Sequence, residues 1–377
     1  MVTYAILFFC SCLLALFITP LLRQAAIRNG ALDYPNERKL HTEAVPRVGG
    51  IVIVISFFAP MVLGYMLLRY ELRESMEHLA GLSIGAVIIS FTGTWDDLWG
   101  LSARKKIVGQ IVSVLALMPF GFVIRELNIP FVGVVDVGWE LGVLLSLFWM
   151  VGVMNTINFI DGMDGLAAGV AVTISAALFV ISVLTGQFLM AAVCLILTGS
   201  TLGFLRYNFH PASIFMGDCG AMFLGFMLGA VSIKALFQNP SLTASSLLPV
   251  LILGLPIMDT SWAIVRRTKK RESPFRADGF HTHHRLMNLG LTQRKASIVL
   301  YAVSFLCISM GFIIVLIGSE RLAVILSATM LTIALVGIMI LGRVSPTPEV
   351  TEHRPPRPSK SSRPVVRKSY KKSYKKS

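Results

Sequence analysis

Asn155-Thr-Ile-Asn-Phe-Ile-Asp-Gly-Met-Asp-Gly165 decides the class of this chain, because it directly follows an apolar segment at 141–154. A charged side chain inside a bilayer costs roughly 2.5–3.5 kcal/mol on insertion scales, so carboxylates beside an apolar segment need a reason. The arrangement recurs at Trp95-Asp96-Asp97 and at Met216-Gly-Asp218-Cys-Gly220. These three acidic groups can meet only if all of them lie on one side of the membrane.

The composition is that of an integral membrane protein rather than a soluble domain. The 377 residues are 55% hydrophobic and 14% charged, and the mean hydropathy is +0.72. Apolar runs long enough to cross a bilayer predict an all-α, polytopic helical bundle with about eleven transmembrane helices. The predicted helices cover 2–22, 48–68, 79–95, 107–124, 141–155, 166–185, 188–205, 219–233, 247–265, 296–318 and 322–342.

The distribution of Lys and Arg predicts which loops face the cytoplasm. With eleven helices, alternate loops and the C-terminal tail together carry 29 of the 34 Lys and Arg residues. Because positively charged loops stay in the cytoplasm, we expect the N-terminus outside and the C-terminus inside. All three acidic groups and the later cluster His281-Thr-His-His284 then face the cytoplasm, so one site built from several loops is geometrically allowed.

Two regions are expected. Residues 1–342 form the transmembrane domain, and residues 343–377 form a disordered, basic cytoplasmic tail rich in Pro, Ser, Lys and Arg. The five cysteines show neither metal-ligand spacing nor a disulfide framework. No Walker loop or Rossmann fingerprint is present, so any nucleotide must be held by short loops, and no nucleic-acid partner is predicted.

The acidic groups are suited to a hard cation. Asp96 and Asp97 are adjacent and repel each other unless a cation such as Mg²⁺ lies between them, although a merely solvated pair at the membrane interface remains an alternative. Asn158, Asp161 and Asp164 are spaced by three and would share one face of a helical turn. Asp218 lies between glycines that allow close approach of a phosphate.

Basic groups in two other loops are suited to phosphate oxygens. Imidazoles and guanidinium groups at His281, His283, His284 and Arg285 favour a diphosphate over another cation, because the surrounding loop is strongly positive. The first cytoplasmic loop adds the candidate anion ligands Arg38, His41 and Arg47. Ordinary positive-inside charge is the alternative for each basic run. Metal ligands beside phosphate ligands are what phosphoryl transfer requires.

Six motifs in order resemble the polyprenyl-phosphate N-acetylhexosamine-1-phosphate transferases, over about residues 30–341. The form of the His motif resembles the N-acetylglucosamine branch, the enzymes that start teichoic acid, O-antigen or enterobacterial common antigen synthesis. The motifs are Asp33 to His41 with Pro46-Arg47-Val-Gly-Gly50, Asp96-Asp97, Asn155 to Ala168, Tyr207 to Asp218, Pro256-Ile-Met-Asp259-Thr260 and His281 to Leu286. Cys219 and Ala221 depart from the family, where Thr and Ser are frequent, and this puts a supporting hydrogen bond in doubt.

The resemblance implies a reaction and its participants. The family transfers a sugar 1-phosphate from a UDP-sugar to undecaprenyl phosphate and releases UMP, with Mg²⁺ as the ion and Mn²⁺ as an alternative. For this chain it implies UDP-GlcNAc as donor and a multi-pass protein of the bacterial plasma membrane, in contact with its lipids and with the active site on the cytoplasmic face. Oligomeric state stays open, with a homodimer as one option.

Roles follow from the same resemblance, position by position. Asp96 and Asp97 match the catalytic aspartate pair linked to the metal and to the acceptor phosphate. Asp161 matches a central catalytic and metal-binding residue, with Asp164 as a further catalytic candidate beside it. The metal-binding aspartate is matched by Asp218. The substrate-binding set is Asn158, His281, His283, His284, Arg285, Arg38, His41 and Arg47.

Several alternatives remain open at the level of sequence. The same chemistry with another UDP-sugar is one of them. An ion-coupled transporter is a second, in which Asp259, inside a predicted helix, would relay protons. The mechanism is either one in-line displacement or a two-step route with an aspartate such as Asp161 as covalent nucleophile.

Overall fold

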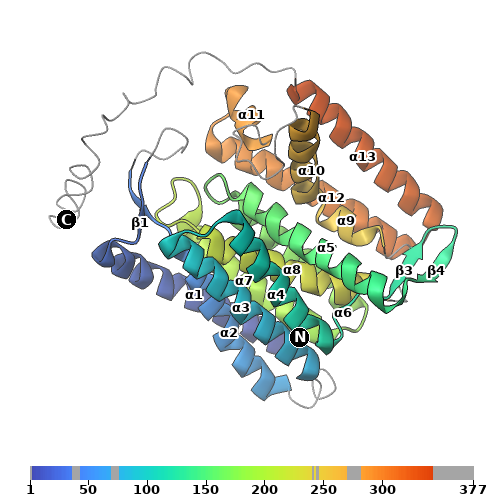
Figure 1. Cartoon of the computed structure of the whole chain (residues 1–377), viewed down its shortest axis with the longest axis horizontal. Coiled ribbons are helices and arrows are strands. Elements are labelled where there is room, and N and C mark those ends of the chain that lie inside the picture. The colour runs from blue at the N-terminus through green and yellow to red at the C-terminus, as the bar shows by residue number, and fades with distance from the viewer. Residues whose placement is uncertain are drawn as a thin grey trace.

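The computed structural model describes residues 2–35, 43–68, 76–239, 242, 246–269 and 282–342, and it is almost entirely helical (Figure 1). The first half contains α1 (Val2–Asn29), β1 (Leu32–Asp33), β2 (Val45–Pro46), α2 (Gly49–Leu68), α3 (Met76–Trp99), α4 (Ala103–Leu117), a 3₁₀ turn (Met118–Phe120), β3 (Glu126–Ile129), β4 (Gly133–Asp136) and α5 (Gly138–Ile160). The second half contains α6 (Leu166–Leu184), α7 (Phe188–Asn208), α8 (Gly217–Ser232), a π-helical segment (Ile233–Phe237), α9 (Leu248–Ile252), α10 (Gly254–Lys269), α11 (Thr282–Asn288), α12 (Gln293–Ile317) and α13 (Glu320–Gly342).

Nine helices of the described residues are long and apolar enough to cross a membrane, against the eleven expected. The other two expected segments are helical but do not reach that length. Helix α4 has only 15 residues and passes into the 3₁₀ turn that contains Pro119, and the ninth expected segment is divided at Leu253 into α9 and α10. A polytopic helical membrane protein is confirmed, while the count of eleven and the orientation of the termini stay predictions. The predicted tail, 343–377, lies outside the described residues.

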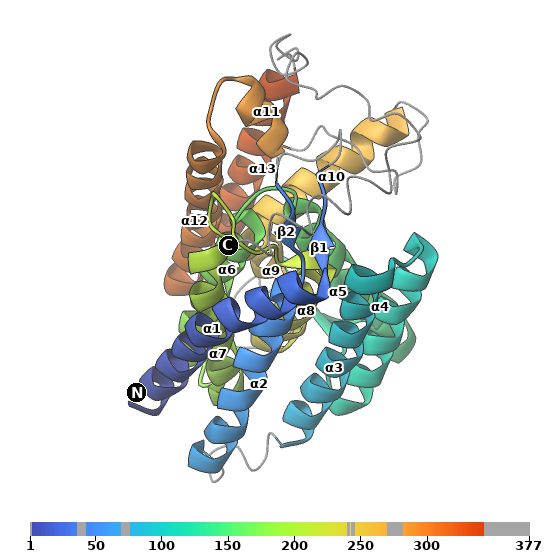
Figure 2. The ribbon, with the colours of Figure 1, turned by 90° about the vertical axis from the view of Figure 1, so that its left-hand side faces the viewer.

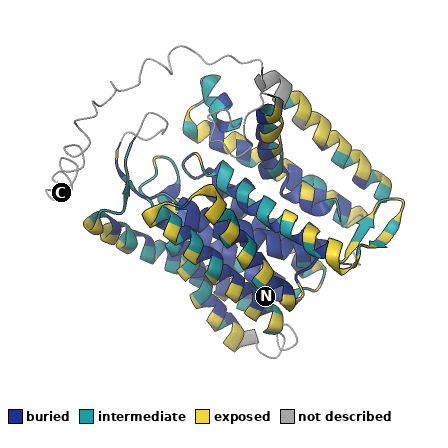
Figure 3. Cartoon of the chain, viewed as in Figure 1, coloured by how far each residue is buried: buried dark blue, intermediate teal, exposed yellow. Residues whose placement is uncertain are grey.

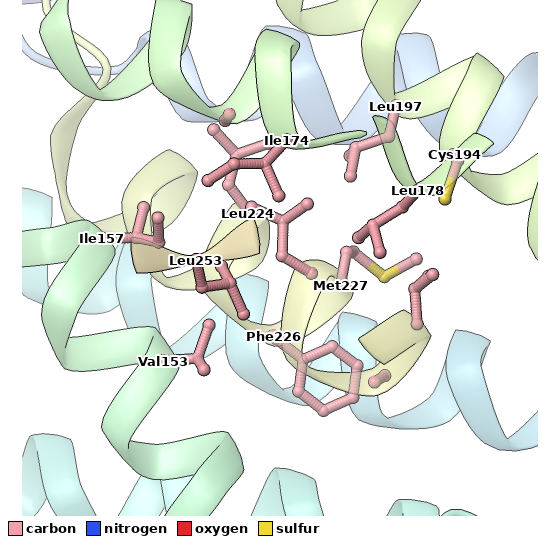
Figure 4. Packing of buried hydrophobic residues seen from close by; sticks show 14 of the residues in the cluster. Val153, Ile157, Ile174, Leu178, Cys194, Leu197, Leu224, Phe226, Met227 and Leu253 are labelled. Carbon is pink, nitrogen blue, oxygen red and sulfur yellow. The ribbon is translucent and has the colours of Figure 1, made fainter. Parts of the chain in front are cut away.

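Helix α8 lies at the centre of the bundle, and all of its residues are buried (Figure 3). It contacts α2, α3, α5, α6 and α7. Glycines permit this close packing, as small residues do in many membrane proteins. A Cβ on Gly93 of α3 would lie 2.4 Å from Cys219 Cα, and a Cβ on Gly225 would lie 2.5 Å from Met154 Cα. Figure 4 shows Leu224, Phe226 and Met227 of α8 among apolar side chains from α5, α6 and α7.

The two short antiparallel ribbons lie outside the bundle core. Strands β1 and β2 pair through Leu32 with Pro46, and they lead the chain from α1 into α2 (Figure 2). Strands β3 and β4 form a hairpin between the 3₁₀ turn and α5. Phe131 N–H at the hairpin tip donates to Glu320 Oε2 at the start of α13, at 2.9 Å. The hairpin and the start of α13 therefore lie at the same end of the bundle.

Candidate active site

Asp218 is the centre of a cluster of charges contributed by four parts of the chain. It lies in the first turn of α8, and its carboxylate is only 9% exposed. Oδ2 accepts from Arg47 Nη2 at 2.5 Å, and Oδ1 accepts from Lys106 Nζ at 2.8 Å and from Asn158 Nδ2 at 2.6 Å. The segment before α2, helix α4 and the end of α5 therefore meet at one carboxylate.

Asp97 holds the start of α8 in place. Its Oδ1 accepts from the backbone N–H of Asp218 at 2.8 Å, and its Oδ2 accepts from that of Cys219 at 3.0 Å. These are two of the N–H groups that a helix start leaves without intrahelical partners. Arg47 Nε lies 3.3 Å from Asp97 Oδ1, so one guanidinium contacts both carboxylates. The sulfur of Cys219 lies 3.3 Å from Thr94 Oγ1 and accepts its hydrogen bond, so this position keeps a polar contact without a Thr side chain.

Asp96 pairs with Lys106, the second cation of the cluster. Lys106 Nζ lies 2.6 Å from Asp96 Oδ2, and the N–H of Leu101 donates to Asp96 Oδ1 at 2.5 Å. Lys106 therefore joins Asp96 to Asp218. Burial alone would lower the pKa of Lys106, but the charges of Asp218 and Asp96 and the hydrogen bonds to them together outweigh it, and the pKa is raised. Burial also opposes the charge of Arg47, yet Asp218 and Asp97 raise the pKa of that guanidinium.

Gly217 is required by this geometry. Its φ is +74°, and a Cβ there would lie 2.6 Å from Asp97 Oδ2. We expect Gly217→Ala to lower kcat/KM at least about tenfold, because a left-handed backbone costs about 1–2 kcal/mol and the methyl group displaces Asp97. Gly138→Ala is the matched control, since its φ is +70° but a Cβ meets nothing within 4 Å. Equal activity losses in the two variants, measured beside their unfolding temperatures, would contradict a specific role of Gly217 in the cluster.

Asn158, Asp161 and Asp164 do not share one helical face, so that prediction is wrong. Helix α5 ends at Ile160, and Asp161 begins a turn with φ −78° and ψ +35°. Only Asn158 stays on the helix and reaches Asp218. Burial first, and then the charge of Asp218, raise the pKa of Asp161 well above its ordinary value, while the charge of Arg47 opposes this rise.

Asp164 turns toward the segment between α7 and α8 instead. Its Oδ2 lies 2.8 Å from His210 Nδ1 and accepts the N–H of Ala212 at 3.0 Å. The hydroxyl of Tyr301 on α12 donates to Gly165 O at 2.6 Å and holds the same turn. Asp164 therefore fastens the turn that carries Asp161 to the segment that leads to Asp218.

The His motif lies beside this turn. His283 and Arg285 on α11 are buried, and a Cβ on Gly162 would lie 3.0 Å from His283 Nε2. The rings of His283 and His284 are 4.3 Å apart. Asp259 on α10 accepts from both the N–H and the hydroxyl of Thr282, so this buried acid anchors the start of α11 rather than standing ready as a proton relay. His281, Arg38 and His41 lie outside the described residues.

Sequence reasoning missed Lys106 in the cluster and His210 in the neighbouring turn. In the sequence Lys106 is one of several basic residues of its loop, and His210 is one position within a motif. A signal for Lys106 existed in the sequence, because three successive basic residues, Arg104-Lys-Lys106, follow an aspartate pair across a short loop. For His210 the partner Asp164 is 46 residues away in sequence, and no local pattern joins them.

Fold and site together define a polytopic membrane protein with interleaved carboxylates and cations at one end of its helices. Residues 79–236 match the family described as Glycosyl transferase family 4. The chain is 36% identical over 307 residues to the "Probable undecaprenyl-phosphate N-acetylglucosaminyl 1-phosphate transferase" of Bacillus subtilis (strain 168), which covers 81% of this chain and 83% of that protein.

Two further relatives agree. The chain is 37% identical over 308 residues to the "Decaprenyl-phosphate N-acetylglucosaminephosphotransferase" of Mycolicibacterium smegmatis, with 76% of this chain and 75% of that protein covered. It is 28% identical over 328 residues to the "Undecaprenyl-phosphate alpha-N-acetylglucosaminyl 1-phosphate transferase" of Yersinia pestis, with 85% of each covered. The chain belongs to the family of polyprenyl-phosphate N-acetylglucosaminyl 1-phosphate transferases, and the resemblance inferred from its motifs is confirmed.

Proposed function

We propose that this enzyme transfers N-acetylglucosamine 1-phosphate from UDP-GlcNAc to undecaprenyl phosphate and releases UMP. The names of its relatives include both the transferred N-acetylglucosaminyl phosphate and the polyprenyl phosphate acceptor. The observation that carries the proposal is the cluster around Asp218, where Arg47 and Lys106 lie within 2.8 Å of one carboxylate that Asn158 also contacts. Two fixed cations beside carboxylates suit a diphosphate whose oxygens gain charge during transfer.

The donor set fits Mg²⁺ held mainly by two carboxylates. Among the described residues no three His, Cys, Asp or Glu side chains form a ready-made metal cage. Mg²⁺ does not need one, because it is commonly bound by one or two carboxylates together with substrate phosphates and water. Asp161 and Asp218 are the pair we assign, since the charge of Asp218 helps to raise the pKa of Asp161 and a divalent cation would relieve that repulsion. When bound, the ion would polarise the diphosphate oxygens of the donor.

We propose a single displacement. An oxygen of the lipid phosphate forms a bond to the β-phosphorus of UDP-GlcNAc, the bond from that phosphorus to the bridging oxygen breaks, and UMP leaves with the electron pair. The acceptor phosphate needs no strong base, because the second pKa of a phosphate monoester is about 6. Asp96 and Asp97 are already hydrogen-bonded to backbone N–H groups. We therefore propose that they orient Lys106, Arg47 and Asp218 and that they do not remove a proton.

The acceptor and the donor would reach the cluster from different sides. A polyprenyl chain stays in the bilayer, and we place its phosphate near the ends of α3 and α4, where Asp96 and Lys106 lie. The water-soluble nucleotide would approach from the loop that carries α11. We propose that this end of the bundle is cytoplasmic, because it carries most of the Lys and Arg residues that the structure describes, and that the membrane is the bacterial plasma membrane.

The decisive experiment measures UMP release by the purified full chain in detergent. We expect release that requires added polyprenyl phosphate together with UDP-GlcNAc and a divalent cation. UDP-N-acetylgalactosamine tests the alternative that another UDP-sugar is the donor. UMP release at the same rate without a polyprenyl phosphate would overturn the assignment of the acceptor, and release only with the second sugar would overturn that of the donor.

His283→Ala and His284→Ala should weaken use of the donor more than use of the acceptor. The His283 ring lies beside Gly162 in the turn that carries Asp161, and the centroid of the His284 ring is 4.3 Å from that of His283. Loss of one hydrogen bond to a charged group costs roughly 1.5–3 kcal/mol, or about ten- to a hundredfold in kcat/KM for UDP-GlcNAc. The test is to measure kcat/KM for each substrate in turn, with the other substrate in excess. A rise only in KM for the lipid would place α11 at the acceptor instead.

A further inference from the structure

The central helix that begins at the active site ends in an isolated cation. After Ser232, the α-helix gives way to a π-helical segment, Ile233–Phe237, whose second residue is Lys234. Such segments are rare and occur frequently at functional sites. The span Gly217–Phe237 has 21 residues, which at 1.5 Å per residue is roughly the thickness of the hydrocarbon core. Lys234 therefore lies near the opposite end of this span from Asp218.

A second basic group converges on the same place. Gly121, with φ +84°, forms the turn that follows the 3₁₀ segment after α4. The position of a Cβ on this glycine would lie 3.4 Å from Lys234 Nζ and 3.4 Å from His78 Nε2. Both groups also border the ring of Phe122, with Lys234 Nζ 5.6 Å from its centroid and the His78 ring 5.8 Å away. The absence of a side chain at Gly121 leaves the space between the two nitrogens open.

No carboxylate neutralises Lys234 among the described residues. The ion pairs of the described chain lie at the other end of the bundle, around Asp218, Asp96 and Asp164. Glu77, next to His78, is exposed and is not paired with Lys234. A half-buried lysine facing an imidazole across an open space is a favourable arrangement for an anion, because an ammonium group donates well to phosphate oxygens.

The surroundings indicate a lipid rather than a soluble anion. A cavity of about 460 Å³ adjoins Gly121, and Arg125, Trp139 and the exposed Glu126 line it, with the Arg125 guanidinium 5.0 Å from the Trp139 ring. Tryptophan is typical of the headgroup level of a membrane. The neighbouring hairpin exposes Phe131 and Val132, whose apolar side chains suit the same depth.

We propose that Lys234 and His78, on either side of Gly121, bind the phosphate of an anionic phospholipid in the leaflet opposite the catalytic site. The lipid phosphate supplies the anionic partner of Lys234, and the acyl chains extend into the bilayer along α3, which exposes Ile84 and Val87. Basic pockets between transmembrane helices bind phospholipid headgroups in this way. The site is separate from the transfer reaction and does not rest on the proposed function.

The test uses the full chain in phosphatidylcholine nanodiscs with increasing fractions of phosphatidylglycerol. Native mass spectrometry after release from the discs measures phosphatidylglycerol retained per protein, and thermal unfolding measures the stabilisation. We expect Lys234→Gln to weaken retention about tenfold, as expected for loss of a charge-assisted hydrogen bond. His78→Gln should weaken it less. Arg321→Gln removes an exposed cation at the same end of the bundle, outside the pair, and should leave retention unchanged.

Each outcome decides the proposal. Equal retention by wild type and Lys234→Gln would overturn it, and so would an equal loss in Arg321→Gln. Inorganic phosphate is added to discs of pure phosphatidylcholine as a separate arm. If inorganic phosphate stabilises the protein as much as phosphatidylglycerol does, the site binds free anions, and the assignment of a lipid as its ligand is overturned. The unfolding temperature in discs of pure phosphatidylcholine serves as the folding control, and if Lys234→Gln does not insert, unchanged retention by His78→Gln overturns the proposal instead.

Discussion

Asp218→Asn is expected to lower kcat/KM by about a hundred- to a thousandfold, the range found when one group that stabilises transition-state charge is removed. The amide keeps the shape of the side chain, but it leaves Arg47 and Lys106 without the carboxylate that they share. It also removes one of the two negative charges that we assign to the cation. The protein should still insert, because the backbone N–H groups at positions 218 and 219 keep their acceptor, Asp97.

The measurement is UMP release at several Mg²⁺ concentrations, with the unfolding temperature as the folding control. Glu140→Gln is the matched charge control, since Glu140 is exposed in the first turn of α5 at the opposite end of that helix from Asn158. Near-wild-type turnover of Asp218→Asn at ordinary Mg²⁺ would refute the metal assignment. Rescue by a large excess of Mg²⁺ would support it, because weaker binding is then compensated by concentration.

Lys106→Gln should have the second largest effect, a loss of about a hundredfold in kcat/KM. Its ammonium lies between Asp96 and Asp218, and without it these two largely buried carboxylates face each other. Removing one partner of a buried ion pair costs about 3–5 kcal/mol, much of it from the charge left unpaired. Lys106→Arg should recover only part of the activity, because a planar guanidinium cannot replace a compact ammonium between two carboxylates.

Lys105→Gln is the matched control for Lys106. The two lysines are adjacent on α4, but Lys105 is exposed and has no ion pair among the described residues. Full activity in Lys105→Gln beside a large loss in Lys106→Gln is the expected result. Similar kinetics of the two variants would mean that net charge at this end of the bundle, rather than the contact with Asp218, is what the reaction needs.

The sequence could predict that the acidic groups converge, because this depends only on the number of membrane crossings between them. Asp96, Asp161 and Asp218 each follow or begin an apolar segment, and an even number of crossings separates them. The prediction survives the uncertain number of helices, since the short α4 and the divided α9–α10 still return the chain to the same end. The contacts of Asp218 with Arg47, Lys106 and Asn158 confirm the meeting of these loops.

The direction of individual side chains could not be predicted in the same way. A spacing of three places Asn158, Asp161 and Asp164 on one face only while the helix continues, and α5 ends at Ile160. Beyond that point the turn is held by Tyr301 and by the pairing of Asp164 with His210, which come from distant segments. The resemblance placed Asp164 beside the catalytic residues, whereas its contacts hold the turn.

Hydropathy, charge distribution and motif order are local properties, and from them the sequence by itself determined a helical membrane protein, its family and the acidic groups of its site. The tertiary structure alone decided that Lys106 joins two aspartates, that Asp97 binds the start of α8, and that Lys234 faces His78 across Gly121. The physical reason is that an ion pair depends on distances of a few ångströms between segments far apart in the chain. Those distances are set by how closely the helices pack, which here depends on glycines such as Gly93 and Gly225 against their neighbours.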